Sequence, residues 1–337
     1  MDQEGEIASQ LEEQHRRLRL LEEQFRAIRE DLGRIARKLD YTISKTEFRV
    51  LPGTPYSKYL LPIEYLPSRA YQPRWGNTHP PIERIQQLIE LYLDDYRAHL
   101  RLMRQLAPQL ADVPLHWDPA AQPQPCWAGT PMNAFDSLLV YSMLAQHKPS
   151  LYLEIGSGIS TLFANRAKRD LSLDMQIWSL DPEPRSEIDA VCDRTMRYGL
   201  EEVDLSVFAQ LTAGDVLFFD GSHRSFTNSD VTVFMIDVLP NLEPGVIVHI
   251  HDIGLPTDYA GFVLDWYWNE QYLLAAYILG GARIRPLMPA SFISQRPDLF
   301  PEHAANPVLL DLSEWNSWAG GGSFWFTHLA PPVEVSR

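Results

Sequence analysis

The chain has 337 residues and a net charge of −15, from 44 acidic and 29 basic side chains. Hydrophobic residues make up 45% and charged residues 22%, which is typical of a globular protein and excludes a wholly disordered one. The acidic balance argues against a nucleic-acid partner and against docking on an anionic membrane, since both need a basic surface.

Nothing in the sequence points to export or to a membrane. No stretch approaches the roughly 20 apolar residues of a membrane span, and the acidic N-terminus shows no signal peptide. Two isolated cysteines, Cys126 and Cys192, suit a reducing compartment. We therefore expect a soluble cytoplasmic protein.

Apolar residues recur with a heptad period near the N-terminus. One seam consists of Leu11, Leu18, Phe25, Leu32 and Leu39, and the other of Ile7, Leu21, Ile28 and Ile35. This pattern predicts a coiled-coil helix within residues 1–45 and a homo-oligomer formed through residues 7–39. The alternative is a single amphipathic helix packed on its own domain.

Two proline-rich stretches flank a predicted helix. The prolines between residues 50 and 81 exclude a long helix or a central strand there and indicate an arm or linker. A 3.6-residue apolar period predicts a helix from about Ile82 to Leu106, and a second break runs from Pro114 to Pro131. We therefore expect a proline-rich arm and helical extension over residues 46–132.

From Asn133 onward, strand and helix patterns alternate. The predicted strands are Leu151–Ile155, Met175–Leu180, Asp215–Phe219, Val246–His251 and Ser323–Thr327. The predicted helices are Ala134–His147, one beginning near Ser160, Asp230–Leu239 and Asn269–Leu279. This alternation predicts an α/β domain with a mostly parallel sheet over residues 133–330.

The strongest local signal is the turn that follows the first of these strands. Gly156 and Gly158 would let the backbone approach a ligand, and the next helix would offer free N–H groups. Glu154 at this turn repels a pyrophosphate but attracts a cation, and Thr161 stands where dinucleotide folds have a third glycine. A positively charged ligand such as S-adenosylmethionine therefore fits better than NAD. The alternative is an ordinary strand-to-helix turn.

Acidic residues also follow the later strands. Asp181 ends the second strand, where a carboxylate can accept both ribose hydroxyls of an adenosyl group, although it could instead cap a helix. Asp220 and Asp252 follow two further strands. Because parallel strands end at one edge of the sheet, these carboxylates would share one rim with Glu154, which is costly unless a cation is bound.

Imidazoles accompany two of these acids. Asp220, His251 and Asp252 could hold a divalent ion such as Mg²⁺, although histidine is a poor Mg²⁺ ligand. Without a metal, His223 or His251 could act as a general base. We expect His249 to be a core residue or to support the site from behind.

Taken in order, the motifs resemble class I S-adenosylmethionine-dependent methyltransferases. The segments that carry the resemblance are Tyr152–Thr161, Asp220–His223, His249–Ile253, Trp268–Leu274 and Gly321–Trp325. They look closest to a bacterial subgroup with His-Asp-Ile and Trp-Asn-Glu-Gln-Tyr signatures, related to sugar and antibiotic O-methyltransferases. The resemblance covers about residues 133–328.

The resemblance implies a Rossmann-like seven-stranded methyltransferase sheet with its last strand antiparallel, flanked by helices. It implies cofactor contacts from Glu154, Gly156, Ser157, Gly158, Thr161, Asp181 and Asp220, with Asp181 at the ribose and Asp220 and His223 beside the reacting methyl group. The related sugar O-methyltransferases bind Mg²⁺ through two adjacent acids after the later strand, where this chain has His251 and Asp252. Asp220 and Asp252 are therefore the candidate metal ligands, and the candidate catalytic residues are His223, Asp220, His251 and Asp252.

The sequence therefore predicts an O-methyltransferase for a small hydroxylated molecule or a glycan in a biosynthetic pathway. The acceptor pocket would form from the segment Leu255–Trp268 and from the aromatic residues of the arm, Tyr56, Tyr59, Tyr65, Tyr71 and Trp75. These aromatic residues could instead only pin the arm to the domain. The alternative functions are a coiled-coil scaffold with an inactive transferase-like domain and a nicotinamide-dependent oxidoreductase.

Overall fold

The computed structural model describes residues 72–76, 78–117, 123–128, 132–184, 187–259, 263–306, 308–309 and 321–329. The predicted coiled coil and most of the proline-rich arm lie outside these residues and stay predictions. The chain divides into two compact units between Ala70 and Tyr71, and all the residues described here belong to the second unit. Within the described ranges, every helix is too short or too polar to cross a membrane.

The second unit consists of short strands and helices that largely alternate. The strands are β1 (Leu151–Ile155), β2 (Gln176–Leu180), β3 (Arg194–Met196), β4 (Val216–Phe219), β5 (Ile247–Ile250), β6 (Ile284–Pro289) and β7 (Phe324–His328). The α-helices are α2 (Glu83–Glu90), α3 (Leu93–Leu106), α4 (Ala134–His147), α5 (Ile159–Asp170), α6 (Asp230–Val233), α7 (Val263–Trp266), α8 (Glu270–Leu279), α9 (Ala290–Ser294) and α10 (Pro301–Ala304). A π-helical turn (Phe234–Val238) and a 3-10 turn (Leu239–Asn241) continue α6.

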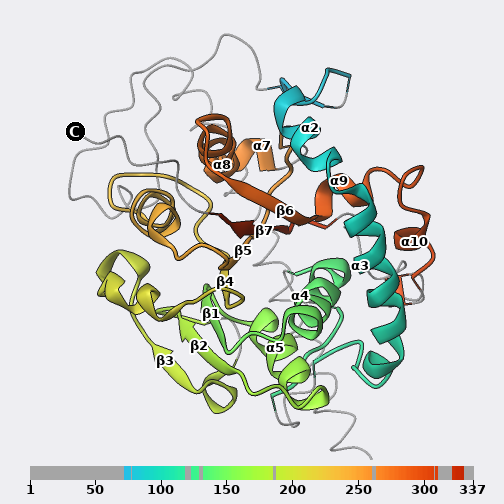
Figure 1. Ribbon diagram of the computed structural model, residues 1–337. Coiled ribbons are helices and arrows are strands. Elements are labelled where there is room, and N and C mark those ends of the chain that lie inside the picture. Colours follow the sequence, from blue (N-terminus) through green and yellow to red (C-terminus); the bar gives the residue numbers. More distant parts are fainter. Residues whose placement is uncertain are drawn as a thin grey trace, which may run out of the picture. The chain divides into compact units, whose positions relative to one another are not determined.

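The strands form one seven-stranded sheet in the order β3-β2-β1-β4-β5-β7-β6 (Figure 1). Strands β1 to β5 pair in parallel, whereas β7 runs antiparallel to both β5 and β6. This is the Rossmann-like methyltransferase arrangement that the motifs imply, so the predicted fold class is confirmed. The central strands β1 and β4 are buried along their whole length, which explains their continuous apolar runs.

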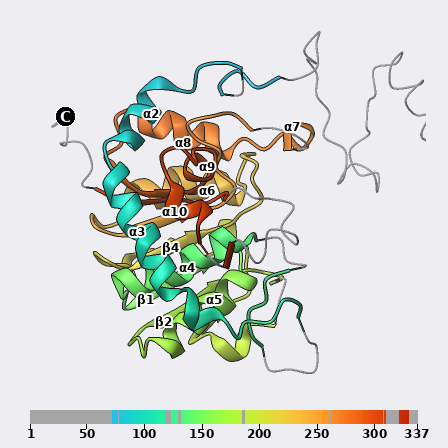
Figure 2. The ribbon, with the colours of Figure 1, turned by 90° about the vertical axis from the view of Figure 1, so that its right-hand side faces the viewer.

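Helices cover both faces of the sheet. Figure 1 shows α4 and α5 on one face and α8 on the other. Helix α4 begins where the Asn133 side chain accepts a hydrogen bond from the Asp136 amide, 2.9 Å away, and it ends at the predicted residue. Helix α3 packs along the outside of α4, as both ribbon views show (Figures 1 and 2), so the helical extension shares the core of the sheet domain.

Two strands have no counterpart among the strands predicted from the sequence pattern. Strand β3 has only three residues, and β6 contains Pro286 and Pro289, which oppose a strand prediction. Both lie at the edges of the sheet. An edge strand needs hydrogen-bond partners on one side only, so it tolerates prolines and short length that a central strand does not.

The helix predicted from Ile82 to Leu106 is broken into α2 and α3. Tyr92 leaves the helical conformation, with φ −122° and ψ 21°, between the two helices. The break lets α2 pack against α8 and β6 while α3 packs against α4. One straight helix could not follow both surfaces.

Candidate functional site

The predicted functional residues gather at the rim where β1, β2, β4 and β5 end. Gly156 in the turn after β1 has a φ of +79°, which favours glycine. A Cβ atom at Gly156 would lie 1.9 Å from the Asp220 carbonyl oxygen, so the turn packs directly on the end of β4. The next residue, Ser157, donates its backbone N–H to the Asp181 carboxylate at 2.6 Å. The turn therefore joins three strand ends.

Asp181 is held by backbone donors at the open side of this turn. Its second carboxylate oxygen accepts the Glu183 amide at 2.8 Å. Arg197 donates to the Asp181 carbonyl oxygen and to the Ser179 hydroxyl, both at 3.1 Å. Each carboxylate oxygen of Asp181 keeps a further lone pair that could accept a ligand hydroxyl.

Glu154 lies beneath the turn, where it is fully buried. Its carboxylate accepts hydrogen bonds from the hydroxyls of Ser160 and Thr161 and, at 3.2 Å, from Tyr152. Burial raises the pKa of Glu154 to about 8, although these hydroxyls act in the opposite direction. Glu154 is not among the residues that line the cleft described below, and it supports the first turn of α5 from behind. Its contact with a cofactor stays a prediction.

A cleft of about 1510 Å³ opens above the rim. Its wall contains Gly156, Ser157, Gly158 and Asp181 together with Asp220 and His251, whereas His223 and Asp252 are not among the residues that line it. The glycine turn, Asp181, Asp220 and His251 therefore face one common space. Thr161 is fully buried and receives the Gly158 N–H at 3.0 Å, so it shapes the turn without lining the cleft.

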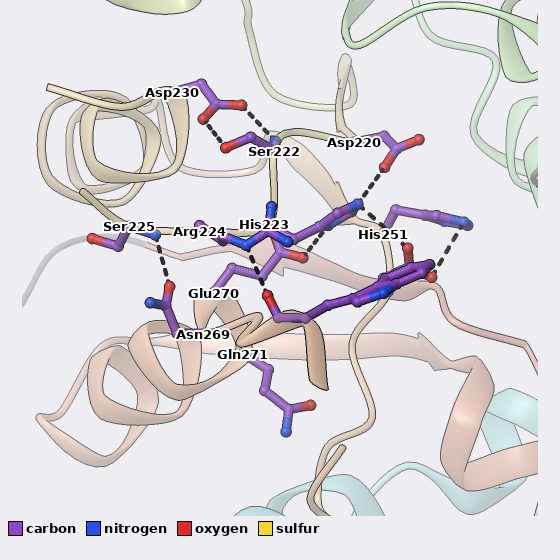
Figure 3. A network of polar contacts seen from close by, with 12 residues as sticks. Asp220, Ser222, His223, Arg224, Ser225, Asp230, His251, Asn269, Glu270 and Gln271 are labelled. Atoms are coloured by element: carbon purple, nitrogen blue, oxygen red, sulfur yellow. Dashed lines mark hydrogen bonds and ion pairs between the residues drawn. The ribbon is translucent and has the colours of Figure 1, made fainter. Parts of the chain in front are cut away.

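Asp220, His223 and Asp252 form a compact cluster at this rim. Figure 3 shows Asp220 beside the ring of His223. The His223 Nε2 atom lies 3.7 Å from Asp220 Oδ1 and 3.5 Å from Asp252 Oδ2. One ligand atom from each residue lies within 4.8 Å of the others, so a single divalent cation could contact all three. His223 and Asp252 both have positive φ, +63° and +53°, a conformation that non-glycine residues adopt rarely and often at functional sites.

Glu270 lies behind His223 and was not predicted to contact it. Its Oε1 atom lies 2.5 Å from His223 Nδ1, and its side chain is fully buried. Burial lowers the pKa of His223, but the carboxylates of Glu270, Asp220 and Asp252 together raise it to about 9. For Glu270 the effect of burial has the opposite sign: it raises the pKa to about 7, although the imidazole of His223 acts to lower it. The pair thus favours a protonated imidazole beside a carboxylate.

His249 in β5 and His251, which directly follows that strand, differ in their surroundings. His251 lines the cleft, and its Nε2 atom lies 3.8 Å from Asp252 Oδ1. Burial lowers its pKa, but Asp252 and Asp220 outweigh this effect and raise it above the usual value. His249 is fully buried, stacks on Phe218 at 3.7 Å, and bonds through Nε2 to the Ser323 hydroxyl. It is a core residue, as expected.

Of the arm residues predicted to line the acceptor pocket, Trp75 lies within the described residues. The Trp75 carbonyl oxygen accepts the Asp258 amide at 2.9 Å, so this part of the arm lies against the segment that follows β5. The arm tyrosines, at positions 56, 59, 65 and 71, lie outside the described residues. Glu270 could have been found only as part of the Trp268–Leu274 string, since 47 residues separate it from His223.

Residues 153–253 match the sequence profile of a methyltransferase domain family. The fold is also similar to solved structures of low sequence identity. A methyltransferase from Podospora anserina with bound S-adenosylhomocysteine is 14% identical, with coverage of 76% of this chain and 100% of that one and a TM-score of 0.37. An O-methyltransferase from Bacillus cereus in complex with S-adenosylhomocysteine is 16% identical, with coverage of 73% and 99% and a TM-score of 0.36.

The O-methyltransferase TomG from Streptomyces achromogenes, in complex with S-adenosylmethionine, is 13% identical, with coverage of 69% and 89% and a TM-score of 0.35. At such identities and TM-scores these likenesses bear on neither substrate nor mechanism. No curated protein matches the chain. The chain is therefore similar to a methyltransferase domain over less than a third of its length, and that part contains the glycine turn, Asp181, Asp220 and Asp252.

Proposed function

We propose that the protein is an S-adenosylmethionine-dependent methyltransferase that methylates a hydroxyl group of a small molecule or glycan in a biosynthetic pathway. The observation that carries this proposal is the shared cleft. Its wall contains the glycine turn, Asp181, Asp220 and His251, and Asp220 also belongs to the cluster with His223 and Asp252 at the same rim of the sheet. The match of residues 153–253 to a methyltransferase domain supports it. A location in the cytoplasm and assembly through residues 7–39 stay predictions.

The polar groups that line the cleft fit S-adenosylmethionine. The turn at Gly156–Gly158 would hold the methionine moiety with backbone groups, and Asp181 would accept the ribose hydroxyls. Asp220 would face the positively charged sulfonium, whose charge offsets the cost of gathering carboxylates at this rim. When bound, S-adenosylmethionine supplies an electrophilic methyl group. The residues of the cleft contribute by aligning an acceptor oxygen with that group, and alignment can supply about 7–11 kcal/mol.

The acid and imidazole cluster would take the proton of the acceptor hydroxyl. His223 holds its Nδ1 against Glu270, so Nε2 is the nitrogen that can receive this proton. His251 is the second candidate base, because it lines the cleft. A positive charge beside Asp220 and Asp252 would lower the pKa of His223 and free its base form. A positioned base contributes roughly 10²–10⁴-fold to the rate.

A divalent cation is the alternative means of activating the hydroxyl. Asp220 and Asp252 would hold it, and Mg²⁺ is the ion that the sequence suggests. The spacing of the two carboxylates and His223 supports such a site. Bound to these residues, a cation would lower the pKa of the acceptor hydroxyl.

The first test is a calorimetric titration of the full-length protein with S-adenosylmethionine, S-adenosylhomocysteine and NADH, each with and without Mg²⁺. We expect both adenosyl ligands to bind and NADH not to bind. Asp181→Ala should weaken adenosyl binding at least about tenfold, since a hydrogen bond to a charged group is worth roughly 1.5–3 kcal/mol. An effect of Mg²⁺ on binding would support the metal alternative.

The matched control is Asp174→Ala, which removes the same charge from an exposed position before the opposite end of β2. It should leave adenosyl binding unchanged. No adenosyl binding by the parent protein would exclude the proposed function and favour a scaffold. Binding of NADH alone would favour an oxidoreductase.

A further inference from the structure

We propose that Glu270 is a positioning residue of this site, which holds the imidazole of His223 by Nδ1 so that Nε2 faces Asp220 and Asp252. The proposal deepens the proposed function and rests on it for the role of Nε2. The contact joins Glu270, the first residue of α8, to His223 in the loop after β4. The two residues are 47 positions apart along the chain. Figure 3 shows the Glu270 side chain reaching the ring of His223 from the side opposite Asp220.

Because Glu270 is buried, its carboxylate depends on the contact with His223. Glu270 is fully buried, and its second oxygen, Oε2, has no hydrogen-bond partner among the described residues. A buried carboxylate without a partner is strongly unfavourable, so the 2.5 Å contact with His223 Nδ1 is what stabilises its charged form. A residue kept only to fill space at this position would be apolar. The carboxylate is explained if its task is to hold the proton on Nδ1.

The backbone of His223 is held by the same end of α8. The Asn269 amide donates to the His223 carbonyl oxygen at 2.9 Å, and the Asn269 side chain accepts the Ser225 amide at 2.7 Å. The Trp268 ring lies 4.0 Å from the imidazole, which it covers on one side. These contacts account for the left-handed φ of +63° at His223, because they keep the loop in a conformation it would not otherwise favour.

The next two residues of the string hold the other loop of the site. Gln271 accepts the Gly254 amide at 2.9 Å, and Tyr272 donates its hydroxyl to Asp258 at 2.6 Å. Figure 3 shows Gln271 directed away from His223. The string Trp268–Tyr272 therefore joins the loops after β4 and β5, but within it only Glu270 hydrogen-bonds to the imidazole. A substitution of Gln271 can therefore serve as the matched control for a substitution of Glu270.

The arrangement has a defined chemical consequence. With its proton on Nδ1 and directed to Glu270, the neutral ring carries its lone pair on Nε2, between the two aspartates. When an acceptor hydroxyl loses its proton, Nε2 gains that proton and Nδ1 keeps its own. The resulting positive charge is balanced by the carboxylate of Glu270. Without Glu270, the ring could take either tautomer or turn away from Asp220 and Asp252.

The test is nuclear magnetic resonance of the full-length protein labelled with ¹⁵N-histidine, free and with S-adenosylhomocysteine. We expect one far-downfield imidazole proton, protected from exchange with water and bonded to Nδ1. It should vanish in His223→Gln, which assigns it, and in Glu270→Gln, which removes the charge at nearly constant volume. Glu270→Asp, which keeps a carboxylate, should retain a weakened signal, and Gln271→Ala should retain the full signal.

Three results would overturn the proposal. One is the absence of the protected proton from the parent protein, which needs no variant to fold. Another is its persistence in Glu270→Gln, and a third is its equal loss in Gln271→Ala, which would mean that only the shape of the loops matters. If S-adenosylhomocysteine does not bind, the proposed function fails, whereas the spectrum of the free protein still decides the pairing of Glu270 with His223.

Discussion

Gly156 lies where the ends of β1 and β4 come closest, and this contact leaves no room for a side chain. We expect Gly156→Ala to lower the free energy of unfolding by about 2–5 kcal/mol, from roughly 1–2 for the left-handed backbone and roughly 1–3 for overpacking. Binding of S-adenosylmethionine should also weaken, because the turn and the end of β4 must move apart. Urea unfolding and calorimetry measure the two effects.

Gly214 provides the control for this substitution. It also has a positive φ, +93°, but a Cβ atom there would meet nothing within 4 Å. Gly214→Ala should therefore show only the backbone part of the effect and leave cofactor binding unchanged. Equal destabilisation in the two variants would contradict a steric role for Gly156.

At the scale of elements, a buried histidine joins α3 to α4. His99 contacts the Gln146 side chain through Nδ1 at 2.6 Å and the Ser142 hydroxyl through Nε2 at 2.8 Å. Burial lowers its pKa from 6.5 to about 4, although the contact with Gln146 acts in the opposite direction. The imidazole is therefore neutral in the folded protein at pH values where the unfolded chain already binds a proton.

This difference predicts that acid weakens the packing of α3 on α4. Between pH 6.5 and about 4 the unfolded chain binds more protons, so the free energy of unfolding falls as the pH falls through this window. His99 contributes up to about 3 kcal/mol to the fall. Urea unfolding at several pH values measures it.

Comparison with His99→Gln isolates the contribution of this residue. The fully buried His249 and the partly buried His303 also have lowered pKa values, and they add to the pH dependence of the stability of the parent protein. The variant should be less stable at pH 7 but lose less stability on acidification. Parallel pH dependence of the two proteins would show that His99 does not carry the effect.

At the scale of the whole molecule, the net charge of −15 acts on the proposed cofactor. The cleft walls contain Asp181, Asp220 and Asp230, with Arg197 as the one lysine or arginine among the described lining residues. S-adenosylmethionine carries a net positive charge, whereas S-adenosylhomocysteine has none. We expect added salt to weaken binding of the first several-fold more than binding of the second, since screening extends over about 10 Å at 0.1 M and 3 Å at 1 M.

Calorimetry at low and high sodium chloride concentration measures both dissociation constants on the same protein. S-adenosylhomocysteine, whose net charge is zero, serves as the control, because it differs from S-adenosylmethionine only in the missing methyl group and sulfonium charge. Equal loss of affinity for both ligands would mean that the acidic rim does not act on the cofactor through its charge.

The sequence by itself determined the elements with strong local patterns and their common rim. Continuous apolar runs mark β1 and β4, and helix α4 begins and ends where its cap and period predict. Because parallel strands end at one edge, acids at the strand ends could be predicted to gather, and Asp181, Asp220 and Asp252 do so. Each of these patterns spans only a few consecutive residues, so it can be recognised in the sequence without knowledge of the fold.

Only the tertiary structure decided what each side chain contacts. It placed Glu154 beneath the turn, brought Glu270 to His223 across 47 residues, and gave edge positions to β3 and to the proline-containing β6. Such contacts depend on how the loops and helices pack, and no local period or motif encodes that packing. The sequence thus determined which residues reach the rim, and packing decided which of them face the cleft and which hold the others in place.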